Sequence, residues 1–175
     1  MRLHLIGHSF GGKLVTASLT GTGSAPNRAD TLVILQGAFS QFAFATRDEI
    51  RAAGVSVDQG GLYRDVLASR LVSSPIVVTY STADLPNRLL YPAGVTLVND
   101  VTEVSRSPRY GSLGALGIRG ATSVPLTLAV QKLAAIESLS PRAVSVDVSG
   151  VILGHSDLIK ADVFRLIWDT VEHSR

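Results

Sequence analysis

Near its start the chain reads Leu3-His4-Leu5-Ile6-Gly7-His8-Ser9-Phe10-Gly11-Gly12, and this stretch decides the predicted fold. A short apolar run stops at Gly7, and Ser9 lies between glycines two positions away on either side. From Phe10 to about Leu19 the apolar residues recur close to helical spacing. The pattern predicts a buried strand that turns sharply into a helix, with a serine at the bend.

The frame Gly7-x-Ser9-x-Gly11 is that of a nucleophile elbow, in which one hydroxyl projects from a strand-to-helix turn. A serine at the apex has strained backbone geometry, and side chains two positions away are expected to collide across the turn. The following helix directs its amides and its positive end toward charge that develops at the serine. The backbone amide of Phe10 is therefore the predicted donor to an oxyanion.

The same residues admit other interpretations. Gly7 to Lys13 nearly spells a phosphate-binding P-loop, but Leu14 stands where that loop has a Ser or Thr for magnesium. Nucleotide binding through Gly7–Lys13 is kept as a minor alternative. A plain strand-to-helix turn in an α/β domain is the other.

Composition limits the classes of protein to consider. The 175 residues fit a single domain, 1–175, of which 46% are hydrophobic and 17% charged. Sixteen basic and fourteen acidic residues are spread without a basic stripe, which argues against nucleic acid as a partner. Without cysteine there is no thiol nucleophile or zinc–thiolate site. No run reaches the roughly 18 apolar residues of a membrane span, and no signal peptide is recognised, so a cytoplasmic protein is expected.

Further along, strand and helix patterns alternate. Apolar runs at 31–36, 75–80 and 143–148 read as strands, and a closing helix carries an apolar stripe from Ile159 to Ile167 with Ser156 or Asp157 as its cap. The prediction is an α/β fold with a mostly parallel sheet of about four strands and helices on both faces. Between 38 and 61 the chain is irregular and rich in phenylalanine, and it reads either as the cover of an apolar pocket or as a loop with a short helix.

A serine hydroxyl needs a base to remove its proton, and the chain has four histidines. His155 is the predicted base because it follows the last strand, where it can reach over the carboxyl ends of parallel strands. His8 is expected to point away from Ser9. His4 is expected in the core or an interface, and His173 in the tail.

The base needs a carboxylate to fix its tautomer, and Asp84, shortly after the third strand, is the predicted acid. Asp58, Asp65 and Asp100 are weaker candidates, and Asp84 itself can also be read as a turn residue. The order Ser9, Asp84, His155 resembles that of the α/β-hydrolase family, and nearly the whole chain is similar to the C-terminal half of that fold.

This resemblance implies a serine hydrolase of the esterase type that acts on a small carboxylic ester through Ser9, His155 and Asp84, with no cofactor or metal. The strands that precede the elbow in that family, and the loop that gives a second oxyanion amide, have no counterpart here. One long edge of the sheet is therefore expected to be unpaired, to be covered by a second copy or by a missing N-terminal segment. A non-catalytic interaction module or a truncated hydrolase is the alternative.

Overall fold

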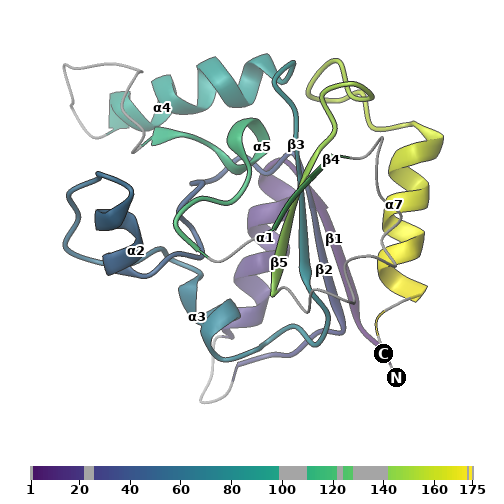
Figure 1. Cartoon of the computed structure of the whole chain (residues 1–175), viewed down its shortest axis with the longest axis horizontal. Coiled ribbons are helices and arrows are strands. Elements are labelled where there is room, and N and C mark those ends of the chain that lie inside the picture. The colour runs from purple at the N-terminus through teal and green to yellow at the C-terminus, as the bar shows by residue number, and fades with distance from the viewer. Residues whose placement is uncertain are drawn as a thin grey trace.

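The sheet is built from five short runs of apolar and β-branched residues, all parallel. A computed structural model describes residues 2–21, 26–98, 110–121, 124–127, 142–172 and 174. The strand order is β1-β2-β3-β5-β4 (Figure 1). The strands are β1 (His4–His8), β2 (Thr31–Leu35), β3 (Ile76–Tyr80), β4 (Val124–Thr127) and β5 (Ala143–Asp147). The predicted α/β class with a parallel sheet is confirmed.

Strand β4 adds a strand to the four predicted from the sequence. It pairs with β5 at the end of the sheet farthest from β1. Its second residue is Pro125, which cannot donate a ladder hydrogen bond. Proline is tolerated in strands at sheet edges, where one side of the backbone needs no partner. Because of this proline, the sequence pattern did not predict the strand.

Helices cover both faces because the strand side chains alternate between them. In β2, Leu32 and Ile34 join a core cluster that includes residues of α1 (Phe10–Thr20) and α3 (Arg64–Ala68). Val33 and Leu35 join a second cluster with α7 (Ala161–Glu172). Figure 1 shows α1 and α7 on opposite sides of the sheet. A strand buried on both faces explains why β2 reads as a continuous apolar run.

The irregular segment after β2 contains one short helix, α2 (Arg47–Ala52). Thr46 begins it with a capping box, in which its hydroxyl accepts from the Glu49 amide and its own amide donates to the Glu49 carboxylate. The three phenylalanines of this segment are all buried: Phe39, Phe42 and Phe44. The segment is therefore a packed part of the molecule.

After β3 the chain continues through a π-helical turn, η1 (Pro86–Leu90), directly into α4 (Tyr91–Val98). A short helix, α5 (Leu113–Leu116), follows within the described residues. This region contains two prolines, Pro86 and Pro92, and proline ordinarily limits the length of a helix. Pro86 is the first residue of the turn, where a missing amide hydrogen costs nothing. Pro92 lies just after the wider π-type turn, so the helical path continues through it.

The closing helix starts later than predicted. Helix α7 begins at Ala161, so the predicted start at Ile159 and the predicted cap at Ser156 or Asp157 are wrong. The Asp157 carboxylate instead accepts from the Leu153 amide at 3.2 Å and pairs with Lys160 at 3.0 Å. These contacts hold the preceding residues in a loop, and Ile159 is 86% exposed.

One edge of the sheet is open. Within the described residues, β1 pairs only with β2, along its whole length from His4 to His8. Leu3 and Ile6 at this edge are 42% and 43% exposed. A parallel strand with apolar side chains and unpaired backbone groups is a template for another strand.

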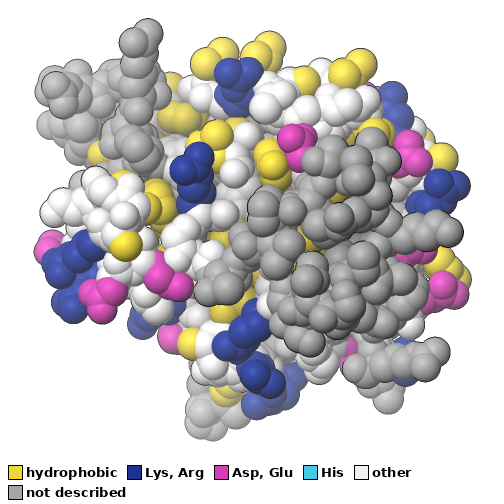
Figure 2. Space-filling view, viewed as in Figure 1, with side chains coloured by type: hydrophobic (Ala, Val, Ile, Leu, Met, Phe, Trp, Pro, Cys, Tyr) yellow, Lys and Arg dark blue, Asp and Glu magenta, His cyan; other side chains and the backbone are white. Residues whose placement is uncertain are grey.

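The surface carries both signs of charge. On the face drawn in Figure 2, basic and acidic side chains are interspersed among apolar and neutral ones. In the described part of the chain, no helix has the length and apolar character needed to cross a bilayer.

Candidate active site

Ser9 occupies a one-residue turn between β1, which ends at His8, and α1, which begins at Phe10. Its backbone has φ 55° and ψ −125°, a conformation that costs a non-glycine residue roughly 1–3 kcal/mol. Two backbone bonds fix it to the end of β2: its amide donates to the Leu35 carbonyl at 3.0 Å, and its carbonyl accepts from Ala38 at 3.2 Å. The surrounding sheet therefore imposes the strained turn.

The glycines of the elbow have different roles. A Cβ added at Gly7 would lie 2.5 Å from the Gly11 carbonyl oxygen, so the turn has no room for a side chain there. A Cβ at Gly11 would meet nothing within 4 Å. Gly12 is the second crowded position, because a Cβ there would lie 2.9 Å from the Ile34 side chain. The collision expected from the motif is found at Gly7, but not at Gly11.

The three residues predicted as nucleophile, base and acid lie together at the carboxyl ends of their strands. Nε2 of His155 is 2.8 Å from the Ser9 hydroxyl oxygen. Nδ1 of His155 lies 2.9 and 3.0 Å from the two carboxylate oxygens of Asp84. An imidazole protonated at Nδ1 donates to Asp84 and accepts the hydroxyl proton of Ser9 at Nε2.

Asp84 is completely buried and is held by Asn87, which the sequence did not single out. The Asn87 backbone amide donates to Oδ1 of Asp84 at 3.0 Å, and its side-chain amide donates to Oδ2 at 2.8 Å. The same side-chain nitrogen donates to the Gln36 carbonyl at 2.9 Å. Hydrogen bonds to a carboxylate favour its charged form and fix its orientation. The only signal in the sequence is an asparagine three residues after an aspartate, which is too common to identify the contact.

Gln36 anchors this network to the end of β2. It is buried, has φ 43°, and donates its amide to the Thr79 hydroxyl at 3.2 Å. Its carbonyl is thereby turned toward Asn87. This left-handed backbone conformation could not be predicted from the sequence, because glutamine is not a residue typical of turns.

The loop that carries His155 is tied to the loop that carries Asp84. The buried hydroxyl of Ser81 donates to the Ile152 carbonyl at 2.7 Å and accepts from the Ala83 amide at 3.1 Å. The Thr82 amide donates to the Ser149 hydroxyl at 2.9 Å. These bonds join the segments that follow β3 and β5, so the distance between base and acid is set by the fold.

His8 belongs to this site, although the sequence led us to exclude it. Its Nε2 lies 2.8 Å from the backbone carbonyl oxygen of His155, to which it can donate, and the two imidazole rings have centroids 4.7 Å apart. Burial lowers the pKa of His8 below its ordinary value of 6.5, and the hydrogen bond to the His155 carbonyl offsets only part of this lowering. A neutral His8 with its proton on Nε2 therefore holds the backbone of the base.

The start of α1 faces the serine. Phe10 is the first helical residue, and the first four amides of a helix have no partner within it. The positive end of the helix dipole adds to the attraction that these amides exert on an anion. The side chain of Phe10 is 67% exposed. Its backbone amide, at the start of α1, is the group expected to donate to an anion at Ser9.

The remaining predicted residues lie elsewhere. His4 is partly buried, with Nδ1 3.0 Å from the Thr31 hydroxyl oxygen. Asp58 and Asp65 are exposed. Asp100 and His173 lie outside the described residues. Among the residues that are described, no group of three or more His, Cys, Asp or Glu is arranged to hold a metal ion.

Comparisons with known proteins were made at the level of family, sequence and structure. No protein-family model matches the chain, and neither a curated protein nor a solved structure does. The function of this chain is therefore inferred from its own geometry.

Proposed function

We propose that the chain is a serine hydrolase of the α/β-hydrolase type that acts on carboxylic esters. The observation that carries the proposal is the hydrogen-bonded series from Ser9 through His155 to Asp84, with 2.8 Å between Nε2 and the hydroxyl and 2.9 Å between Nδ1 and the carboxylate. Nucleophile and base are within the range expected for direct proton transfer. The base is oriented in turn by a buried acid.

In the proposed reaction the Ser9 oxygen attacks the ester carbonyl carbon while His155 takes the hydroxyl proton at Nε2. The imidazolium is stabilised by the Asp84 carboxylate at Nδ1. It then gives its proton to the departing alcohol oxygen as the carbon–oxygen bond breaks, which leaves an acyl group on Ser9. Water, deprotonated by His155, attacks this acyl group and releases the carboxylic acid and the free serine.

The tetrahedral intermediates carry negative charge on the former carbonyl oxygen. The Phe10 amide, at the start of α1, is the proposed donor to that oxygen. The α/β-hydrolase type uses a second amide from a loop that precedes the elbow strand. Loss of one such donor costs roughly 2.7–4 kcal/mol of transition-state stabilisation, so we expect slow turnover where this donor is lacking.

A fluorophosphonate probe tests the proposal directly, because it forms a covalent bond only with an activated serine. We expect stoichiometric labelling of the folded protein, no labelling of Ser9→Ala, and unchanged labelling of Ser18→Ala. Ser18 is a matched control, since it is an exposed serine on α1, the helix that follows Ser9, and its hydroxyl donates to the Val15 carbonyl. Folded protein that takes up no probe would favour the non-catalytic module.

Nucleotide binding through Gly7–Lys13 has less support. A P-loop wraps phosphate in a loop of several residues between strand and helix. Here α1 already begins at Phe10, which places Gly11, Gly12 and Lys13 inside the helix. A thermal shift with Mg-ATP that disappears in Lys13→Ala would restore this alternative.

We also propose that a strand covers the open edge of β1, either from a second copy of the chain or from an N-terminal segment that precedes the elbow strand. The support is the pairing of β1 on one side only and the exposure of Leu3 and Ile6. Light scattering after size-exclusion chromatography would reveal a dimer, and Ile6→Lys should dissociate it. If the protein is instead a monomer, and adding an upstream segment speeds ester hydrolysis, then that segment is the one that covers β1. We also propose a cytoplasmic location, which is the expectation stated in the sequence analysis.

A further inference from the structure

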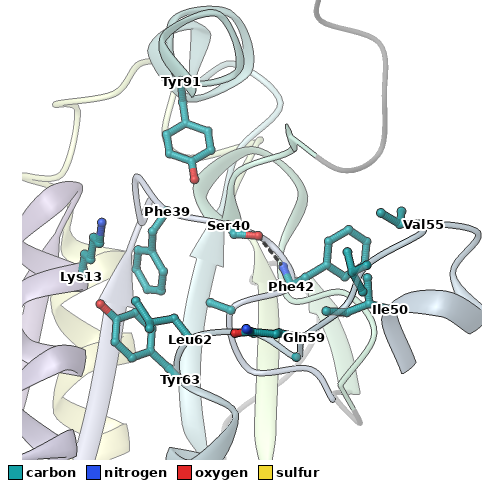
Figure 3. Close-up of a pocket in the computed structure, with 14 residues that line it drawn as sticks. Lys13, Phe39, Ser40, Phe42, Ile50, Val55, Gln59, Leu62, Tyr63 and Tyr91 are labelled. Carbon is teal, nitrogen blue, oxygen red and sulfur yellow. Dashed lines mark hydrogen bonds between the residues drawn. The ribbon is translucent and has the colours of Figure 1, made fainter. Parts of the chain in front are cut away.

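A cavity of about 290 Å³ lies beside the elbow, between α1, the segment after β2 and the start of α4 (Figure 3). Most of its wall is aromatic or aliphatic, with Lys13 and Gln59 among the polar exceptions. We call this cavity the elbow pocket. Four aromatic side chains line it: Phe39, Phe42, Tyr63 and Tyr91.

The walls of the elbow pocket continue directly into the loops of the candidate site. Lys13 lies four residues beyond Ser9, one turn along α1. Phe39 follows Ala38, whose amide donates to the Ser9 carbonyl. The Phe39 ring also approaches the elbow itself, 3.6 Å from where a Cβ on Gly12 would lie. The Phe39 ring therefore belongs both to the wall of the pocket and to the packing around the elbow.

The elbow pocket is also connected to the segment that holds Asp84. Tyr91 begins α4, which continues the π-helical turn that contains Asn87, the partner of Asp84. In Figure 3 the Tyr91 hydroxyl points down toward Phe39 and Ser40, across the space between the walls. Helix α1, which follows Ser9, and helix α4, which follows the Asp84–Asn87 contact, thus each contribute a residue to the same pocket.

The shape of the pocket follows from two separate hydrophobic clusters that meet there. Phe39 and Tyr63 belong to the main core, with ring centroids 5.7 Å apart and planes at 86°. Phe42, Ile50 and Val55 belong to a small cluster of their own around α2. Figure 3 shows the two groups on opposite sides of the pocket. A flat ring inserted between them can stack or pack edge to face on aromatic walls, which prefer such contacts.

The charge at the pocket selects among aromatic ligands. Aromatic walls alone would also suit a quaternary ammonium group through cation–π attraction. Lys13 opposes this, because this positively charged residue lines the same pocket and makes no ion pair with any acid that the structure describes. Burial raises the pKa of Tyr91 to about 12, so its hydroxyl stays neutral and leaves the positive charge uncompensated. A neutral or anionic ring is therefore favoured over a cationic one.

We propose that the elbow pocket binds an aromatic acyl group of the ester substrate, neutral or anionic in charge. The inference rests on the proposed function, since it assigns the acyl part of the substrate attacked by Ser9. It names aryl-alkanoyl esters as the substrate class and makes Lys13 a residue that determines specificity.

The test compares p-nitrophenyl esters that share one leaving group: acetate, 3-phenylpropanoate, and 4-(trimethylammonio)butanoate. We expect kcat/KM for the phenylpropanoate to exceed that for the acetate by roughly tenfold or more, from burial of the ring. The cationic ester should be no better than the acetate, and Lys13→Met should improve it selectively. Equal rates for the acetate and phenylpropanoate esters in an active enzyme would overturn the proposal.

A matched pair of tryptophan variants tests whether filling the elbow pocket removes the preference for the aromatic ester. Leu62 lines the pocket and is 70% exposed, whereas Leu89 is 61% exposed and does not line it. Leu62→Trp should abolish the preference by lowering kcat/KM for the phenylpropanoate ester toward that for the acetate. Leu89→Trp should leave the preference unchanged. A preference that survives Leu62→Trp would place the aromatic group elsewhere.

A binding measurement separates this inference from the proposed function. The Ser9→Ala variant should still bind 3-phenylpropanoate, detected by saturation-transfer NMR, and Leu62→Trp should weaken that binding. Failure of the hydrolase proposal would appear as absence of fluorophosphonate labelling, whatever the binding result. Labelling of Ser9 without any binding of 3-phenylpropanoate would overturn the pocket assignment alone.

Discussion

His8 lies close enough to donate from its Nε2 to the backbone carbonyl of His155 over 2.8 Å, although the two residues are 147 positions apart in the chain. The residue immediately before the nucleophile thus holds the residue proposed to activate it. The contact fixes the backbone of His155, while Asp84 fixes its ring. Nucleophile, base and acid are therefore coupled through both side-chain and main-chain hydrogen bonds.

Removing the His8 hydrogen bond should slow hydrolysis while the protein stays folded. We expect His8→Phe, which keeps a ring against His155 but cannot donate, to lower kcat by roughly tenfold, the equivalent of about 1.4 kcal/mol. The measurement is turnover of p-nitrophenyl acetate, with circular dichroism to confirm the fold. His4→Phe is the matched control, because His4 is on the same strand and contacts Thr31 instead. Equal losses in both variants would contradict a role for His8 at the base.

The depressed pKa of His8 predicts a pH dependence of stability. Because burial lowers this pKa below 6.5, the unfolded chain binds this proton more readily than the folded protein does. The free energy of unfolding should therefore fall as the pH drops below 6.5, toward the lower pKa of the folded state. Urea unfolding at about pH 7.5 and about pH 5.5 measures the loss, which should be smaller in His8→Phe. The same loss in both proteins would show that His8 does not contribute.

The elbow glycines should respond very differently to alanine. Gly7→Ala places a Cβ 2.5 Å from a backbone oxygen, so the turn must open and stability should fall by several kcal/mol. Gly11→Ala meets open space inside a helix and should be neutral or stabilising by about 0.5–1 kcal/mol. Chemical denaturation of both variants checks the difference. A destabilised Gly11→Ala would mean that the motif needs both glycines for steric reasons.

Asn87 should influence both the orientation of the Asp84 carboxylate and the stability of the protein. Asn87→Ala removes the side-chain donor shared by Oδ2 of Asp84 and the Gln36 carbonyl, which should cost about 1–3 kcal/mol of stability. A carboxylate that is held less firmly orients His155 less well, so kcat for p-nitrophenyl acetate should also fall. Ser112→Ala is the control, because Ser112 donates to the Asn87 carbonyl at 2.9 Å without touching Asp84. A purely structural Asn87 would lower stability and leave kcat unchanged.

Much of the fold could be predicted because apolar runs and their spacing report burial locally. The run at 31–36 is buried on both faces in β2, and the glycine–serine frame marks the turn from β1 into α1. Three features escaped prediction: the proline-containing edge strand β4, the π-helical turn before Pro92, and the late start of α7. Pairing with β5 fixes the edge strand, and a hydrogen bond from Asn87 to the distant Gln36 ties down the π-helical turn. The late start of α7 has a local cause, the contacts of Asp157 with its near neighbours.

The identities of Ser9, Asp84 and His155 were predicted from motif and chain order, and the structure brings them into hydrogen-bonding distance. Their supporting residues were not predicted. His8 was expected to point away, and Asn87 was not considered. Such contacts depend on the directions in which side chains point at the ends of neighbouring strands. The spacing of apolar residues along the sequence does not predict these directions.

By itself the sequence determined most of the strands and helices and the chemical groups available at their ends, because burial and turn chemistry leave local patterns. Only the tertiary structure decided which groups meet, how His8 holds the backbone of His155, and that Lys13 of α1 lines an aromatic pocket. The reason is physical: hydrogen bonds at the site join residues as far as 147 positions apart, and their geometry exists only once the sheet has brought the strand ends together.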